Sequence, residues 1–325
     1  MSDPLVSILI PCHNAARWLR ATLESALAQT WPRTEIIVVN DGSTDDSAAI
    51  AREFVSRGVR VIDQPNSGPG AALNRALRES TGDFVKFLDA DDLISPDSVA
   101  IQVATLRTSG SREIAVGEWA RFRDDPSEAR FEPQQSRGWH DGTPVDWIVE
   151  TWDDGEPMYQ NAMFLIPRLL LDAAGGWDES LTLINDHEFY TRLVLVSDGV
   201  RFTPGARLFY RSGIAGSISK RKNRAACESA KRSVLLSAEH LLKVEDSPRT
   251  RRAAARMIRS IVYSFYPAHA DLADELEREV ARLGGTDLKP QGGVAFRTIA
   301  AVAGWRAALR MRSWLQPVLH QSSKR

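Results

Sequence analysis

Apolar and polar residues alternate along the first ninety residues in a pattern typical of strands separated by helices. Short apolar runs predict four buried β-strands, at 5–10, 35–39, 59–62 and 83–88. The segments between these runs have helical spacing and predict helices over 18–27, about 43–56 and 71–79. Because strands and helices alternate, we expect a parallel, right-handed, doubly wound half-domain.

The pattern changes after about residue 110. Residues 110–220 mix apolar runs with turn residues, whereas the pattern from about Asn223 onward is helical. The helical part is interrupted near Pro248, Pro267, Gly284 and Gly292. The sequence therefore predicts an α/β domain over residues 1–220 and a helical C-terminal region over residues 221–325.

Three carboxylates follow the fourth predicted strand. Asp89 and Asp91 are two residues apart, so their side chains point the same way in an extended segment, and Asp92 comes next. Ligands bind at the carboxyl ends of strands in open α/β sheets. Two such carboxylates can hold a divalent cation, which in turn can hold a diphosphate. The alternative is a solvated acidic turn that caps the next helix near Ser95, the usual role of an isolated D-x-D.

Polar residues also end the first two predicted strands. Pro11-Cys12-His13-Asn14 follows the first strand, which we expect to stop at Pro11, and Asn40-Asp41-Gly42-Ser43 follows the second. Both segments should line one crevice with Asp89 and Asp91. Asp41 can accept hydrogen bonds from a base or a ribose, although Asp41-Gly42 taken alone is typical of an ordinary turn. The chain has neither G-x-G-x-x-G nor a P-loop motif.

Composition narrows the classes of protein that fit. The chain has 325 residues, 43% hydrophobic and 26% charged, and a formal net charge of −1, which does not indicate nucleic-acid binding. Its two cysteines, Cys12 and Cys227, have no ligand-like spacing and fit a reducing compartment. Residues 1–4 lack a basic leader, and no apolar stretch approaches the roughly 18 residues of a spanning helix. We therefore expect a cytoplasmic protein.

Six blocks, in order along the chain, carry a resemblance to a known family. They lie at 7–14, 39–45, 66–74, 82–92, 175–179 and 186–193. With N-D-G-S-T-D at 40–45 and L-D-A-D-D at 88–92, residues 5–220 resemble the family 2 glycosyltransferases of the GT-A fold. The resemblance implies an α/β, Rossmann-like GT-A nucleotide-sugar transferase domain, followed here by a C-terminal helical region.

The resemblance also implies an activity. Enzymes of this family transfer a sugar from a nucleotide-diphosphate donor with inversion at the anomeric carbon, and UDP is the nucleotide we expect. The acceptor is expected to be a saccharide or a lipid-linked molecule, in the synthesis of a surface polysaccharide or glycolipid. The residues that match the nucleotide-sugar site of the family are Pro11, Asn14, Asp41, Asn66, Asn74, Asp89 and Ala90.

Two carboxylates match the positions that bind metal and act as general base in the family. By resemblance, Asp91 ligates Mn²⁺ or Mg²⁺ under the diphosphate, and Asp186 is the general base. Inverting transfer needs a base for the acceptor hydroxyl and positive charge for the departing diphosphate. Glu188 is the alternative base, two residues further along a predicted helix. Asp186 could instead be an acid that interacts with the dipole of that helix.

Two positions depart from the family pattern. The run 210–219 lacks a histidine that many relatives carry there and that can help to bind metal, and Leu73 stands where relatives often have arginine. We therefore expect metal binding to depend on Asp91, the diphosphate and water.

Two other functions remain as alternatives. A nucleotidyltransferase would usually have a Gly-rich basic loop after its first strand, and a non-catalytic sugar-nucleotide or glycan-binding module would not need Asp186.

Two segments outside the blocks are candidates for partner contacts. Residues 139–160 should build the acceptor side, with most tryptophans in the core; the residues considered are Trp139, His140, Trp147, Trp152, Tyr159 and Gln160. His13 and His140 are expected to be structural. The basic residues at 220–224 either close over the diphosphate or form a solvated helix start.

The residues after Asp287, called the tail, carry only positive charge. After Asp287 there are seven basic residues and no acidic residue. One amphipathic helix is predicted, because apolar residues recur at helical spacing at Ile299, Val302, Trp305 and Leu309. We expect this helix to pack on the catalytic domain, with peripheral contact to the inner face of the cell membrane as the alternative.

Overall fold

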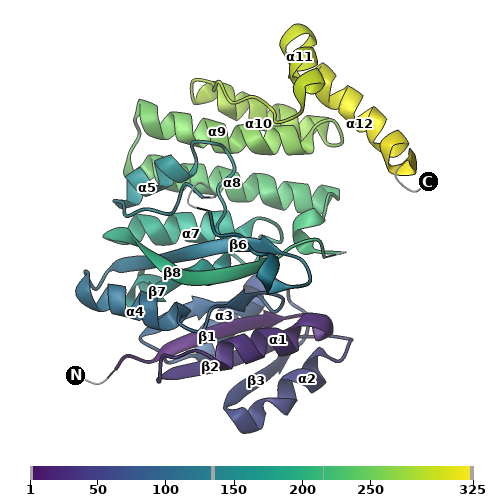
Figure 1. The fold of residues 1–325 in the computed structure, drawn as a ribbon. Coiled ribbons are helices and arrows are strands. Elements are labelled where there is room, and N and C mark those ends of the chain that lie inside the picture. The colour runs from purple at the N-terminus through teal and green to yellow at the C-terminus, as the bar shows by residue number, and fades with distance from the viewer. Residues whose placement is uncertain (1–2, 133–135, 215, 323–325) are drawn as a thin grey trace.

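The computed structural model describes residues 3–132, 136–214 and 216–322, and the side chains of these residues except those of residues 218 and 316–322. Of the segments discussed above, Met1, Ser2, Ala215, Lys324 and Arg325 lie outside this part. The α/β part is built on an eight-stranded sheet with the order β3-β2-β1-β4-β7-β6-β8-β5 (Figure 1). The strands are β1 (Val6–Cys12), β2 (Thr34–Asp41), β3 (Val59–Gln64), β4 (Phe84–Phe87), β5 (Leu93–Ile94), β6 (Glu113–Phe122), β7 (Phe164–Pro167) and β8 (Gly199–Arg211).

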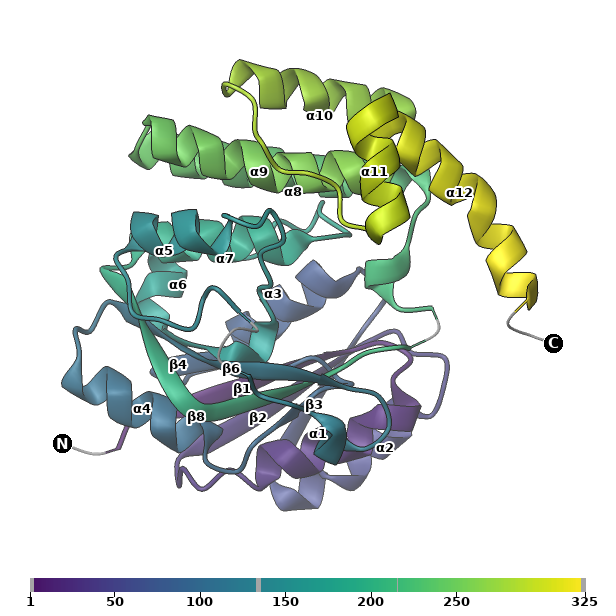
Figure 2. The same cartoon turned by 45° about the horizontal axis from the view of Figure 1, so that its top comes forward.

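The helices cover both faces of the sheet and continue beyond it. They are α1 (Ala16–Leu27), α2 (Ser47–Glu53), α3 (Pro69–Glu79), α4 (Ser98–Thr108), α5 (Pro144–Thr151), α6 (Arg168–Ala174), α7 (Asn185–Val196), α8 (Arg224–Val244), α9 (Pro248–Phe265), α10 (Ala270–Arg282), α11 (Val294–Ala303) and α12 (Trp305–Ser322). Figure 2 shows α3 and α7 on the same side of the sheet, with α8, α9 and α10 stacked beyond α7.

Strand directions place the candidate residues at one edge of the sheet. β1 pairs in parallel with β2 and β4, and β2 pairs in parallel with β3. β7 is antiparallel to both β4 and β6, and β8 runs parallel to β6. The carboxyl ends of β1, β2, β4 and β8 therefore lie at the same edge. The α/β prediction is confirmed, and the β1–β4 half has the expected parallel topology.

The sequence predicted that the first strand stops at Pro11, but the strand continues through Cys12. Pro11 lies within β1 and pairs with Val39 of β2. On its other side, β4 pairs only as far as Leu9, so the sheet requires no N–H from Pro11 there. The second helix is also shorter than predicted. α2 begins at Ser47, whose N–H donates to Oδ1 of Asp45 at 3.0 Å, and a 3₁₀ turn over Val55–Arg57 follows it.

The tail forms two helices, which corrects the prediction of one amphipathic helix through Leu309. Gly304 has a φ of 83° and separates α11 from α12. Val302 is 84% exposed, whereas Leu309 is buried and the Trp305 ring lies 5.2 Å from that of Tyr263. The start of α12 thus packs on α9, and its far end projects from the molecule (Figure 1). Within the described residues, no helix has the length and apolarity needed to cross a membrane.

Candidate active site

The acidic turn after β4 is held rigidly by its neighbours. The hydroxyl of Thr22 on α1 donates to the carbonyls of Ala90 and Asp92, at 3.0 and 2.9 Å. The backbone N–H of Arg211, at the end of β8, donates to Oδ1 of Asp92 at 2.7 Å. Nε of Arg211 donates to the carbonyl of Asp91 at 2.8 Å. Asp92 is therefore a structural residue, and the turn is fixed from α1 and β8.

The Arg211 side chain lies between two aromatic rings. Its guanidinium carbon is 4.3 Å from the ring centres of both Trp18 and Phe122. Arg211 lies in the run 210–219, which departs from the family pattern, and no sequence motif predicts this role. Burial raises the pKa of Asp91, and the charge of Arg211 opposes this rise and so favours the ionised form.

The carboxylates of the turn are crowded by like charge. Burial, the charge of Asp91 and then that of Asp186 raise the pKa of Asp89 to about 7, against a hydrogen bond from Asn161 that lowers it. Burial also raises the pKa of Asp91. A bound cation would relieve this repulsion. Among the described residues, no group of three or more His, Cys, Asp or Glu side chains could hold a metal ion, so other ligands would have to complete its coordination.

The end of β2 organises the loop that follows β3. Asp41 is buried and accepts hydrogen bonds from Nε2 of Gln64 and the N–H groups of Ser67 and Gly68, at 2.8, 2.8 and 2.9 Å. A Cβ on Gly42 would lie 2.7 Å from the backbone nitrogen of Asn66, and Gly42 has a φ of 65°. Glycine is therefore required where the two loops meet.

His13, Asn14 and Asn66 gather beside this loop. Nδ1 of His13 lies 2.7 Å from the carbonyl oxygen of Asp41, and Nδ2 of Asn66 lies 3.2 Å from Nδ1 of His13. Asn14 has a φ of 51°, and its Oδ1 accepts from the N–H of Thr44 at 2.8 Å. The structure thus brings Asn14, Asp41 and Asn66 together. Their contact with a nucleotide remains a prediction.

Asn74 has a structural position. Its Nδ2 donates to the carbonyl of Trp177 at 3.0 Å and to Oε1 of Glu179 at 2.8 Å. Its Oδ1 accepts from the N–H of Trp177 at 2.8 Å. A Cβ on Gly176 would lie 2.5 Å from this same oxygen. Asn74 therefore ties α3 to the loop before α7, and its contact with a nucleotide remains a prediction.

Asp186 lies at the start of α7, near the acidic turn. Its Oδ1 accepts from the N–H of His187 at 3.1 Å. Burial raises the pKa of Asp186, while the charge of His187 opposes the rise. The charge of Asp186 in turn contributes to the raised pKa of both Asp89 and Tyr159. The donor-side and base-side carboxylates predicted from the sequence are therefore close enough to influence each other.

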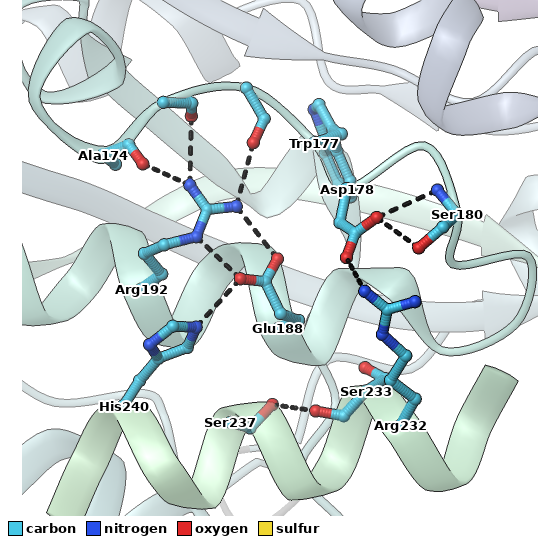
Figure 3. Close-up of polar contacts among 12 residues, drawn as sticks. Ala174, Trp177, Asp178, Ser180, Glu188, Arg192, Arg232, Ser233, Ser237 and His240 are labelled. Atoms are coloured by element: carbon cyan, nitrogen blue, oxygen red, sulfur yellow. Dashed lines mark hydrogen bonds and ion pairs between the residues drawn. The ribbon is translucent and has the colours of Figure 1, made fainter. Parts of the chain in front are cut away.

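Glu188 faces the other way, toward α8 (Figure 3). Its two oxygens accept from Nε and Nη2 of Arg192 at 2.7 and 2.9 Å, and Oε1 also lies 3.0 Å from Nε2 of His240. Burial raises the pKa of Glu188, but the hydrogen bonds from Arg192 and His240 outweigh it and bring the pKa to about 2. Arg192 also donates to the carbonyls of Ala174 and Gly176. Glu188 thus belongs to a network that joins α6, α7 and α8.

Asn161 was missed by the sequence reasoning. Its Nδ2 donates to Oδ1 of Asp89 at 2.9 Å, and its Oδ1 accepts from the Tyr190 hydroxyl at 3.2 Å. The neighbouring carbonyl of Ala162 accepts from Nζ of Lys86 at 2.6 Å. Burial lowers the pKa of Lys86 to about 7. An asparagine that follows Tyr159-Gln160 and begins a 3₁₀ turn gives no sequence pattern that would reveal this bridge.

Trp139 lies away from the carboxyl edge of the sheet that carries the acidic turn. Trp139 stacks on Phe202 at 6.0 Å, near the start of β8, whereas Arg211 marks the site at the end of that strand. Of the other residues considered in this segment, Trp147 and Trp152 are fully buried in the core, as expected for most tryptophans.

The basic run after β8 has other partners. Nε of Arg224 donates to Oε1 of Glu228 at 2.8 Å, and Arg224 also pairs with Asp271 at 2.5 Å. Nζ of Lys220 donates to the carbonyl of Ile214 at 3.0 Å. Arg224 therefore joins α8 to α10, as part of the start of α8.

Comparisons with known proteins agree with this geometry. Residues 7–165 match the model of a family described as Glycosyl transferase family 2. An uncharacterized glycosyltransferase of Rickettsia typhi is 31% identical over 197 residues, 60% of this chain and 60% of that protein. Glycosyltransferase GlyA of Streptococcus pneumoniae is 37% identical over 131 residues, 40% of this chain and 18% of that protein. The chain thus matches about three fifths of the first relative and about a fifth of the second.

Two solved structures share the fold over most of their length. S. aureus TarS 1-349 in complex with UDP-GlcNAc has a TM-score of 0.61 and 17% identity, covering 96% of this chain and 92% of that chain. The mannosyltransferase PcManGT from Pyrobaculum calidifontis, in complex with GDP-Man and Mn²⁺, has a TM-score of 0.56 and 18% identity, covering 97% and 86%. Together with the family match and the curated relatives, this likeness confirms the resemblance: residues 7–165 belong to Glycosyl transferase family 2, and the chain has the GT-A fold.

Proposed function

We propose that the protein is an inverting, metal-dependent glycosyltransferase. It moves a sugar from a nucleotide-diphosphate donor, with UDP as the nucleotide, to a saccharide or lipid-linked acceptor in the synthesis of a surface polysaccharide or glycolipid. The observation that carries the proposal is the proximity of Asp186 to Asp89, whose pKa it raises, at the carboxyl edge of the parallel strands. A donor site and a separate carboxylate for an acceptor hydroxyl would thereby share one edge.

Asp186 is proposed as the general base. Burial raises its pKa, so the carboxylate has a higher affinity for the proton of an acceptor hydroxyl than an exposed aspartate. Glu188 is a poorer candidate, because its pKa is about 2 and Arg192 and His240 occupy its oxygens. The proposal keeps residues 1–220 as the transferase domain and residues 221–325 as the helical region.

Mn²⁺ or Mg²⁺ fits the acidic turn. Asp91, with Asp89 beside it, would supply a carboxylate oxygen of the kind that these cations prefer, and the donor diphosphate and water would complete the coordination. When bound, the cation supplies positive charge for the departing diphosphate. Arg211 holds the backbone of Asp91 and contributes a fixed positive charge next to it. The metal dependence is supported by analogy, since PcManGT is described in complex with GDP-Man and Mn²⁺.

A panel of donors tests the function. Thermal shift with UDP- and GDP-sugars, with and without Mn²⁺, identifies the donor, and the rate of nucleotide release in the presence of acceptor saccharides measures transfer. We expect one sugar nucleotide to stabilise the protein in a Mn²⁺-dependent manner and to be turned over. Stabilisation without turnover on any acceptor would favour a non-catalytic binding module, and release of pyrophosphate from a nucleoside triphosphate and a sugar phosphate would favour a nucleotidyltransferase.

We further propose a cytoplasmic enzyme that contacts the inner face of the membrane through the end of α12. Trp314 is 75% exposed on this projecting helix, Leu315 is next to it, and the sequence after Asp287 has no acidic residue. Replacing Trp314 and Leu315 by alanine should leave the melting temperature unchanged and reduce co-sedimentation with anionic vesicles. Equal co-sedimentation of variant and wild type would refute membrane contact at this surface.

A further inference from the structure

The segment before Asp186 is held by two serines of α8. The N–H groups of Thr182 and Leu183 donate to Oγ of Ser229, at 2.7 and 3.1 Å. Oγ of Ser233, one turn further along α8, donates to the carbonyl of Ile184 at 2.5 Å. Three successive residues of the segment thus have backbone hydrogen bonds to the helical region, which begins forty residues later in the sequence.

Ile184 has a strained backbone. Its φ and ψ are 57° and 32°, in the left-handed region that β-branched residues rarely adopt. It is the N-cap residue of α7 but has no side-chain oxygen to cap the helix, and N-cap residues usually have extended backbones. Strain of this kind persists only where surrounding contacts enforce it. Here the enforcing contacts include the hydrogen bonds from Ser229 and Ser233.

We infer that Ser229 and Ser233 are positioning residues for Asp186. Asp186 follows Ile184 by two residues, so the backbone angles at Ile184 set the direction in which α7 leaves the loop and hence the place of the Asp186 carboxylate. Without the Ser233 hydroxyl, Ile184 can relax toward the extended region and rotate the first turn of α7. The inference rests on the proposed function, in which Asp186 is the general base.

Other contacts make α8 a rigid support for this loop. His240 of α8 contacts Glu188, and Arg232 of α8 lies 3.5 Å from Oδ2 of Asp178 (Figure 3). Both Ser229 and Ser233 are buried, and the side of α8 that carries them also buries Ala226 and Ala230. Small side chains of this kind let α8 approach the loop closely enough for hydroxyl-to-backbone hydrogen bonds.

Ser237 provides a matched control. It lies one turn beyond Ser233 on α8 and is equally buried, but its hydroxyl donates to the carbonyl of Ser233 within the same helix, at 2.9 Å. Ser237→Ala therefore removes a buried hydroxyl from α8 without removing a contact to the loop. Any loss due to helix or core stability should appear in both alanine variants.

The experiment compares kcat and donor KM for the variants of α8. Ser233→Ala should lower kcat about tenfold and leave the donor KM within twofold, because a small displacement of a catalytic group affects chemistry more than donor binding. Ser233→Thr, which keeps the hydroxyl, should recover most of kcat, and Ser229→Ala should act in the same direction as Ser233→Ala. Ser237→Ala should stay within twofold of wild type in both parameters. Equal kcat for Ser233→Ala and Ser237→Ala would overturn the inference.

A second variant tests the mechanism through Ile184 itself. Ile184→Gly removes the steric cost of the left-handed conformation, so the loop needs less support. In that background Ser233→Ala should change kcat by less than threefold, whereas additive effects would refute coupling through the backbone of Ile184. If the wild-type protein transfers no sugar, the proposed function is rejected. If Asp186→Asn has the kcat of wild type, only the assignment of Asp186 as the base is rejected.

Discussion

Glu188→Gln separates a structural role from a catalytic role for the second acid of α7. In the folded protein the pKa of Glu188 lies at about 2, against an ordinary value of 4.5, because Arg192 and His240 hydrogen-bond to its carboxylate. A difference of this size corresponds to about 3 kcal/mol of stability at neutral pH. The side chain is only 5% exposed, so water screens little of this interaction. We expect Glu188→Gln to lower the free energy of unfolding at pH 7 by roughly that amount.

The stability lost in Glu188→Gln should be greatest at neutral pH and should disappear in acid. Because folding lowers the pKa of Glu188, its stabilising effect is complete above the unfolded value near 4.5 and disappears as the pH falls toward about 2. The unfolding free energies of wild type and variant should therefore differ most at pH 7 and converge below pH 4.5. Urea unfolding followed by circular dichroism at a series of pH values measures this difference.

An exposed acid provides the control. Glu239 pairs with Lys243 on the surface of α8, with 55% and 66% of the two side chains exposed. Glu239→Gln should leave stability close to that of wild type at any pH, because water screens an exposed pair. The reasoning is refuted if Glu188→Gln is as stable as wild type at pH 7. A variant that keeps its stability but loses transfer a hundredfold would move the general base to Glu188.

Three other variants address the site directly. Asp186→Asn should lower kcat roughly 10²-fold while leaving donor affinity nearly intact, as steady-state kinetics and calorimetry can measure, since it removes the base and keeps the donor site. Asp91→Ala should abolish transfer and weaken Mn²⁺-dependent donor binding by about 2 kcal/mol, measured by calorimetry. Asn161→Asp should raise the donor KM about tenfold, because a carboxylate would face Oδ1 of Asp89; an unchanged KM would show that Asn161 does not orient Asp89.

The parallel half of the sheet could be predicted because its pattern is local. Each strand of this half is a short apolar run bounded by turn residues, and the alternation with helices determines the topology. Parallel strands place their carboxyl ends together, so the meeting of Asn14, Asp41 and Asp89 at one edge followed from the order of the motifs. The misplaced end of the first strand shows the limit: Pro11 is tolerated inside β1 because β4 is short, and the length of β4 is a property of the assembled sheet.

Residues that act across long sequence separations could not be predicted. Asn161 reaches Asp89 from 72 positions away, and its orientation depends on Tyr190 of a third segment. Trp139 belongs to the segment that was expected to build the acceptor side, but it stacks on Phe202 at the opposite end of β8 from Arg211. Composition and residue spacing predict the secondary structure of a segment. They do not predict which end of a strand the segment packs against, because that depends on the assembled fold.

The boundary of the family match separates the two halves of the site. The match ends at residue 165, after the loops around Asp41 and Asp91 but before Asp186. Ser233 of the helical region donates to the carbonyl of Ile184, two residues before Asp186. The proposed donor half is thus built from residues close to the shared strands, whereas the segment that carries the proposed base also contacts α8. Under the proposed function, changes in the helical region would therefore alter the placement of Asp186 without altering the donor half.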